Sequence, residues 1–199
     1  MGRILTFRED DHIYELDGEV LPSVSEICRF IDREIYGEVN QYVLDNAAQR
    51  GTNVHKATEA LDKYGEVECD DEIIPYVRAY VQFRKDHKCE WDKIEFSTYN
   101  AGLRYACTID RAGTMDGKTV LLDIKTTSSL QTVRVTAQLT LYKMALETQG
   151  FRIDDCYALR LDKEGKYHLK KIEPDCELAN SVLYLHNALK KKPRKKKGE

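Results

Sequence analysis

The pattern of apolar and polar residues divides the chain into a short β-rich start, a helical stretch, and a long segment in which strands and helices alternate. Short β-branched and aromatic runs predict strands at residues 4–7, 13–16, 93–98, 104–111, 118–125, 156–161 and 167–172. Helical periodicity predicts helices at residues 36–48, 52–63, 72–88, 133–148 and 176–189. Ser23 and Glu26 form a capping box that opens a further helix toward Phe30. This order predicts an α/β fold (mixed α+β) in which helices flank a central mixed sheet.

Length and composition are those of one globular domain. With 199 residues, of which 42% are hydrophobic, the chain can bury a core of its own, which we place at residues 1–189. No apolar run is long enough to cross a membrane, and no secretory leader of the basic-plus-apolar kind is present at the start. We therefore expect a cytoplasmic protein with no membrane partner.

A tight turn brings two acidic residues together near the middle of the chain. Asp116-Gly117 lies between two strand-forming runs, which is the signal of a two-residue type I′ hairpin. Counting outward from this turn makes Asp110 and Asp123 direct cross-strand partners, with Cβ atoms about 4.5–5.5 Å apart. Strand alternation then places Lys125 on the same face as Asp123.

This pairing of Asp110 with Asp123 predicts a metal site. Two carboxylates so close repel each other unless a cation lies between them. With the ammonium group of Lys125 they form a face that suits a divalent metal and an attacking water. A solvated acidic hairpin is the alternative, because Asp–Lys alternation is common on exposed strands. The apolar flanks at residues 119–122 and Ile124 indicate instead a mostly buried strand, where charges are rare unless paired or metal-bound.

Two of the predicted helices carry polar residues one turn apart. Residues 50–55 read RGTNVH, so that His55 and the later Glu59 share one helix face. Gln138 and Tyr142 are likewise four residues apart in the helix that follows the hairpin. Neither pair identifies a site alone, because each is a weak signal by itself.

The order of these motifs resembles that of one nuclease group. A helical RGTxVH, an aspartate in the first hairpin strand, a D-(hydrophobic)-K and a QxxxY follow one another as in the RecB-like branch of the PD-(D/E)xK nuclease superfamily. Residues 12–25 are similar to this branch too, and the resemblance extends to about Leu161. It implies a restriction-endonuclease-like core. One position departs from the family pattern GxxD, because Cys107 stands where the family has glycine.

The resemblance implies roles for the matching residues. Asp110 and Asp123 would bind Mg²⁺ or Mn²⁺ through hard oxygen atoms, together with the backbone carbonyl of Ile124. His55 would be a further ligand, which makes Mn²⁺ relatively better than in an all-oxygen site; a plain helix residue is its other interpretation. Lys125 would orient the attacking water and offset the charge that builds up on the phosphate.

Four residues have less defined roles. Glu95, in the strand before the hairpin, is a candidate further acidic ligand. Glu59 either orients His55 as a second layer of the site or faces solvent. Gln138 and Tyr142 would contact the DNA backbone near the scissile phosphate. Packing of that helix on the sheet is the alternative, in which Tyr142 belongs to the core.

The cysteines indicate a reducing compartment. All six stand singly, without a CxxC pair, and a chain of this size does not need a disulfide framework. Some relatives in this nuclease family hold an iron–sulfur cluster with closely spaced C-terminal cysteines. This sequence lacks that group, so we expect no cluster.

Charge is distributed unevenly along the chain. The formal net charge is −3, but residues 190–199 carry seven Lys and Arg with one Glu, which leaves 24 basic and 33 acidic residues, or −9, in the rest. An acidic body argues against a broad basic groove, so affinity for DNA would come from local Lys and Arg, the metal and this tail. We expect the tail to be disordered, and it also resembles a nuclear localisation signal. A solvated tail and a phosphate-binding arm both remain open.

The leading interpretation is a metal-dependent DNA exonuclease of the small stand-alone type found in phages and prophages, used in recombination or repair. An endonuclease with the same core and a catalytically inactive DNA-binding module are the alternatives. The presence of Asp110, Asp123 and Lys125 argues against the inactive module, which has no need of all three. RNA as a substrate, a homo-oligomer and a recombination partner protein remain open.

Overall fold

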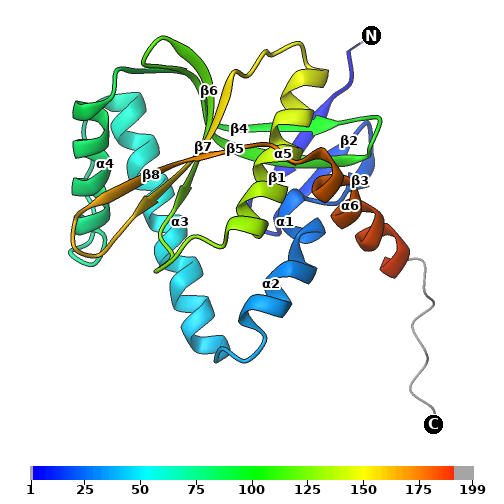
Figure 1. Cartoon of the computed structure of the whole chain (residues 1–199), viewed down its shortest axis with the longest axis horizontal. Helices are drawn as coiled ribbons and strands as arrows, with labels where there is room; N and C mark the ends of the chain where they lie inside the picture. Colours follow the sequence, from blue (N-terminus) through cyan, green and yellow to red (C-terminus); the bar gives the residue numbers. More distant parts are fainter. Residues whose placement is uncertain (1, 191–199) are drawn as a thin grey trace.

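The computed structural model describes residues 2–190, which form two sheets with helices packed around them (Figure 1). The strands are β1 (Leu5–Arg8), β2 (Ile13–Leu16), β3 (Glu19–Leu21), β4 (Cys89–Asn100), β5 (Tyr105–Met115), β6 (Lys118–Lys125), β7 (Asp155–Leu161) and β8 (Tyr167–Ile172). The helices are α1 (Val24–Ile27), α2 (Arg29–Tyr36), α3 (Gln41–Tyr64), α4 (Ile74–Asp86), α5 (Thr132–Thr148) and α6 (Cys176–Lys190). Apart from Lys190, the predicted basic tail lies outside the described residues.

The larger sheet is mixed and, within residues 2–190, has five strands in the order β4-β5-β6-β7-β8. β4, β5 and β6 form an antiparallel meander, β7 runs parallel to β6, and β8 returns antiparallel to β7. The parallel pair is connected by a crossover through α5, as parallel strands require. The predicted α/β fold class, a mixed sheet flanked by helices, is therefore confirmed, and it is consistent with a restriction-endonuclease-like core.

Helices cover both faces of the larger sheet, which buries its central strands. α3 and α4 pack on one face, against Val120, Leu122 and Ile124 of β6. α1, α5 and α6 pack on the other face, where the intervening Leu121 belongs to their core. Figure 1 shows α3 and α4 toward the left of the view and α5 and α6 toward the right. The nearly continuous apolar sequence of β6 follows from this burial on both sides.

The smaller sheet supports the start of β5. β1, β2 and β3 pair antiparallel, and Tyr14 and Leu21 from this sheet pack against Ala106 of β5. The hydroxyl groups of Tyr14 and Thr108 lie 2.7 Å apart, which ties the small sheet to the strand that carries Asp110.

The helices predicted at residues 36–48 and 52–63 were expected to be separate, and this is wrong. They form the single helix α3, which follows the N-cap Asn40 and ends at Gly65 in the left-handed conformation. Thr52 does not cap a helix; its hydroxyl donates a hydrogen bond to the Ala48 carbonyl at 3.2 Å within the helix. Gly51 costs about 1 kcal/mol in a helix interior, but packing of α3 against the sheet outweighs that propensity.

The start of the chain also differs from the prediction in detail. Ser23 caps a helix as expected, and its hydroxyl accepts a hydrogen bond from the Glu26 amide at 3.0 Å. The helix is interrupted, however, because α1 ends at Ile27 and α2 begins at Arg29. Strand β3 was not predicted, since its three residues are too few to show an alternating pattern.

The β5–β6 hairpin has the predicted register. Both residues of the Asp116-Gly117 turn have positive φ, as a type I′ turn requires. The pairing of β5 with β6 continues from this turn but ends one pair before Asp110 and Asp123. The two carboxylates therefore lie where the ladder of backbone hydrogen bonds stops.

Candidate metal centre

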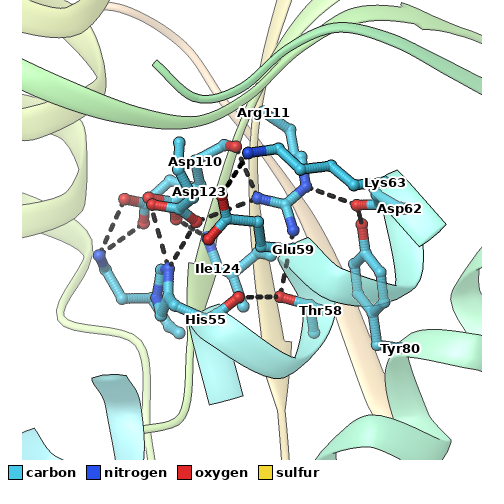
Figure 2. A network of polar contacts seen from close by, with 12 residues as sticks. His55, Thr58, Glu59, Asp62, Lys63, Tyr80, Asp110, Arg111, Asp123 and Ile124 are labelled. Carbon is cyan, nitrogen blue, oxygen red and sulfur yellow. Dashed lines mark hydrogen bonds and ion pairs between the residues drawn. The ribbon is translucent and has the colours of Figure 1, made fainter. Parts of the chain in front are cut away.

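Side chains from α3, β4 and β5 converge on one point beside the end of the β5–β6 ladder (Figure 2). His55 Nδ1, from α3, lies 3.3 Å from Glu95 Oε1 on β4 and 3.7 Å from Asp110 Oδ1 on β5. One nitrogen or oxygen from each of the three residues lies within 4.8 Å of the others. These atoms form a compact set of candidate ligands with imidazole and carboxylate chemistry.

The side chain of Asp110 makes a hydrogen bond to β6 just beyond the point where the β5–β6 backbone pairing ends. Its Oδ2 accepts a hydrogen bond from the Ile124 amide at 2.6 Å. In an antiparallel ladder, the amide and carbonyl of one residue point toward the same neighbouring strand, so the Ile124 carbonyl also faces β5. The backbone oxygen that the family resemblance implies as a ligand thus lies on the same side as Asp110.

Asp123 is the most enclosed carboxylate of the group. It is 1% exposed, and Lys125 Nζ lies 2.9 Å from its Oδ1 and 2.7 Å from its Oδ2. Both oxygens of Asp123 are thus held by the Lys125 ammonium in an ion pair. The clustered donor atoms are those of His55, Glu95 and Asp110, and this combination of imidazole and carboxylates fits a divalent metal.

The electrostatics of the cluster reflect its crowded carboxylates. Burial raises the pKa of Asp110, and the nearby Glu95 charge raises it further. Burial likewise raises the pKa of Asp123, with the charge of Asp110 adding to the effect. Burial lowers the pKa of His55, but Asp110 and Glu95 outweigh it and raise this pKa to about 9. A divalent cation would take the place of the proton that the imidazole holds at neutral pH.

Glu95 is held in its position by a buried arginine that the sequence analysis did not identify. Arg111, which is fully buried, donates from Nη1 to Glu95 Oε1 at 3.0 Å and to the Asp110 carbonyl at 2.7 Å. Glu95 has φ 45°, a left-handed conformation that costs a non-glycine residue about 1–2 kcal/mol. Arg111 therefore fixes one candidate ligand directly and supports the backbone of another.

The charge of Arg111 is balanced by a second buried carboxylate. Arg111 Nε donates to Asp62 Oδ2 at 2.6 Å, and the same oxygen accepts from the Tyr80 hydroxyl at 2.5 Å. Arg84 pairs with the other oxygen of Asp62, and Arg111 Nη2 donates to the Thr58 hydroxyl at 3.2 Å. Figure 2 shows this network running from the candidate centre to Tyr80.

The remaining predicted residues lie in different surroundings. Glu59 pairs with Lys63, at 2.5 Å between Oε1 and Nζ, whereas the hydrogen bond of His55 Nδ1 is accepted by Glu95 Oε1. Cys107, at the position of the family glycine, is 2% exposed and packs in the core beneath α5.

Gln138 and Tyr142 are both buried on α5. Gln138 Nε2 donates to the Tyr142 hydroxyl at 2.6 Å, and Arg134 Nη1 donates to Gln138 Oε1 at 3.0 Å. Burial raises the pKa of Tyr142 well above its usual value, and the charges of Asp123 and Asp110 add to this rise. The polar face of α5 is thus directed toward the aspartates, while both side chains are only 5% exposed.

Arg111 and Asp62 were not among the predicted site residues, although each has a signal in the sequence. Arg111 is a charged residue in a strand with apolar flanks, which requires a buried partner. Asp62 follows His55 by seven residues, so it lies on the same face of α3. The partner itself could not be predicted, because it depends on which helix covers β5.

Comparisons with known proteins give distant structural likenesses. No family model and no curated protein matches the sequence. Among solved structures, the crystal structure of SSO0001 is 14% identical with a TM-score of 0.48, and the likeness covers 86% of this chain and 76% of that one. The crystal structure of an alkaline exonuclease (LHK-Exo) from Laribacter hongkongensis is 13% identical with a TM-score of 0.38, covering 69% of this chain and 78% of that one.

Within residues 2–190, no helix combines the length and apolar character that crossing a bilayer requires.

Proposed function

We propose that this protein is a divalent-metal-dependent nuclease that hydrolyses phosphodiester bonds in DNA. The observation that carries the proposal is the meeting of His55, Glu95 and Asp110 beside the paired Asp123 and Lys125. Buried carboxylates that repel one another are unfavourable in a metal-free protein, and a divalent cation relieves that cost.

The ligand set would comprise His55, Asp110 and Asp123, with Glu95 and the Ile124 carbonyl as additional oxygens. Mixed imidazole and carboxylate ligands suit Mn²⁺, and the carboxylates also suit Mg²⁺. A bound divalent cation supplies Lewis-acid chemistry, which activates water at neutral pH and stabilises charge on phosphate oxygens.

Lys125 would supply positive charge from a protein side chain, in addition to the charge of the bound metal. Its ammonium group lies 2.7 Å from Asp123 Oδ2 and its side chain is 22% exposed, so it is anchored and still reachable by a substrate. There it would orient the attacking water and stabilise the negative charge that develops on the phosphate. The buried α5 pair Gln138 and Tyr142 would frame the scissile phosphate from the side of Asp123.

Within this class we favour an exonuclease of the RecB-like PD-(D/E)xK branch, of the stand-alone phage or prophage type used in recombination or repair. The ordered motifs at His55, Asp110, Asp123 and Gln138 support the family. The acidic body disfavours wrapping of an internal duplex, whereas a strand end needs few phosphate contacts. A site-specific endonuclease would also need side chains that read base edges.

Replacement of Lys125 by alanine tests the chemistry. We expect Lys125→Ala to lower the cleavage rate at least about 100-fold, because an interaction made mainly in the transition state is lost. Mn²⁺ binding, measured by calorimetric titration, should persist. Lys118→Ala is the matched control, since it removes a lysine from the other end of β6 and should leave cleavage unchanged. Wild-type turnover in Lys125→Ala would exclude the proposed site.

The mode of attack is tested with end-labelled linear DNA and covalently closed relaxed circles, each with Mg²⁺, with Mn²⁺ and with EDTA. We expect metal-dependent loss of the linear form and little cutting of the circle. Equal fragmentation of the circle would identify an endonuclease of the same core. DNA binding without cleavage of either form, in the presence of bound metal, would identify an inactive binding module.

A further inference from the structure

Beyond the metal centre, three strands bring basic residues into one row. Lys125 on β6 pairs in register with Arg160 on β7. Two pairs further back, Asp123 on β6 lies level with Ala158, which in turn pairs with Lys170 on β8. The row therefore starts beside the candidate metal ligand Asp123 and crosses β7 to the edge strand.

The three basic side chains share the face of the sheet that α5 covers. Ile124 and Leu159 pack toward α3 and α4, so the next residues, Lys125 and Arg160, point to the opposite face. Lys170 Nζ donates to the Thr132 hydroxyl at 2.9 Å, which places it against the first residue of α5. The row therefore lies on this face of the sheet, beside the N-terminal end of α5.

Arg160 is the most informative member of the row. It is only partly exposed, yet its guanidinium makes no ion pair or hydrogen bond with any residue in the described part of the chain. Basic residues commonly protect edge strands, but β7 lies inside the sheet between β6 and β8, so edge protection does not explain Arg160. The nearby carboxylate of Asp162 is occupied by His168, at 2.8 Å. An arginine held on a rigid strand with free donors suits phosphate.

We propose that Lys125, Arg160 and Lys170 form a path for the phosphate backbone of the nucleic-acid strand that enters the site. Neighbouring strands are about 4.8 Å apart, and Lys170 lies two residues along β8 from His168, the register partner of Arg160. The diagonal row therefore spans about 12 Å, the rise of three to four nucleotides. This inference rests on the proposed nuclease function and adds the direction in which the substrate leaves the metal centre, across β7 toward β8. In a body of formal charge −9, such a local row supplies the charge complementarity that the surface as a whole lacks.

The path is tested by binding in the absence of cleavage. A fluorescently labelled single-stranded oligodeoxynucleotide is titrated with protein in EDTA at several salt concentrations, and affinity is read by anisotropy. Arg160→Ala and Lys170→Ala should each reduce the slope of log K against log salt by about 0.7, so that the weakening of binding is about fivefold greater at 0.1 M salt than at 1 M. Arg152→Ala is the matched control, because Arg152 is 92% exposed and precedes β7 at its opposite end. It should bind like the wild type.

The outcomes separate this inference from the proposed function. Unchanged affinity and slope in Arg160→Ala and Lys170→Ala would overturn the path, even if the wild type cleaves DNA. A reduced slope in both variants of a wild type that does not cleave would retain the path and reject the nuclease. Absence of oligonucleotide binding by the wild type in EDTA would overturn the path, and the cleavage assay with Mg²⁺ and Mn²⁺ would then decide the nuclease separately.

Discussion

At the scale of single residues, the geometry of the candidate centre depends on Arg111. Its guanidinium reaches Asp62, Glu95 and the Asp110 carbonyl at once, which a lysine ammonium on one stem could not do. Arg111 touches no substrate in the proposed reaction, so it acts as a positioning residue. Its partner Asp62 anchors it to α3, the helix that also carries His55.

We predict that Arg111→Gln lowers the Mn²⁺ affinity of the folded protein about 10- to 100-fold, the usual effect of losing a group that orients a metal ligand. Calorimetric titration measures this affinity, and thermal unfolding identifies the temperatures at which the variant is folded. If Arg111 acts through Glu95, the same substitution should have little further effect on affinity in a Glu95→Gln background.

Arg84→Gln is the control for this prediction. Arg84 pairs with Asp62 on the side away from Glu95, so its loss should reduce stability without changing Mn²⁺ affinity. Additive effects of Arg111→Gln and Glu95→Gln on Mn²⁺ affinity would show that Arg111 does not act through Glu95. An unchanged Mn²⁺ affinity in Arg111→Gln would show that Arg111 contributes to folding alone. If Arg111→Gln does not fold, the same measurements are made on Arg111→Lys, which retains the buried charge.

At the scale of elements, Asp155 ties three strands together at the start of β7. Its carboxylate accepts from Lys118 of β6 at 2.8 Å and lies 2.7 Å from Lys171 Nζ of β8. The hydrogen bonds from Lys118 and Lys171 lower the pKa of Asp155 from 3.8 to about 2. Because the pKa in the folded state lies below that of the unfolded chain, the stabilisation is present above pH 3.8 and is lost as pH falls toward 2.

Asp155→Asn should therefore lower the free energy of unfolding by on the order of 1 kcal/mol at pH 7, as expected for a partly exposed ion-pair cluster. Urea unfolding at a series of pH values measures the difference from the wild type. We expect this difference to be constant from about pH 7 to 5 and to shrink below pH 3.8. Glu173→Gln, which removes an 81% exposed carboxylate beside the same Lys171, should show no such trend. A difference that is independent of pH would rule out the ion-pair explanation.

Elements were predictable from sequence where a local pattern decides them. The bounds of β6 follow from an apolar run and those of β8 from a short β-prone segment after the Glu164-Gly165 turn, and the register of the β5–β6 hairpin follows from Asp116-Gly117. The continuity of α3 was not predictable, because Gly51 and Thr52 signal a break that only packing on the sheet overrides.

The same distinction holds for the site. His55, Asp110, Asp123 and Lys125 were found by spacing and motif order, and the structure brings them together. The network that holds them was not found, since the contact of Arg111 with Asp62 joins residues 49 positions apart. Which carboxylate would contact His55 also needed the fold, because Glu59 and Glu95 were equally available in the sequence.

At the scale of the whole molecule, we expect two groups of basic residues to contribute to nucleic-acid binding: the C-terminal tail and the row across β7. Removing residues 191–199 deletes six Lys and Arg but retains Lys190, which pairs with Glu26 at 3.0 Å. We predict that this truncation weakens oligonucleotide binding and reduces the salt slope, by up to about 0.7 for each phosphate that the tail neutralises, without changing the rate of cleavage at saturating DNA. Its effect on the slope should add to that of Arg160→Ala, because the tail carries no part of the row across β7. An unchanged slope would mean that the tail does not bind nucleic acid.

The buried pair of Asp110 and Asp123 has a consequence for how such sequences diverge. Both carboxylates are disfavoured by burial, so neutral replacements at these positions would relieve a cost in the metal-free protein. Mutational drift in a lineage released from selection for cleavage would therefore remove them early, while the apolar cores on both faces of β6 persisted. Under the proposed function, their joint presence here is what continuing selection for cleavage would leave. Chains with this fold that have lost both acids would be the descendants in which only binding remained under selection.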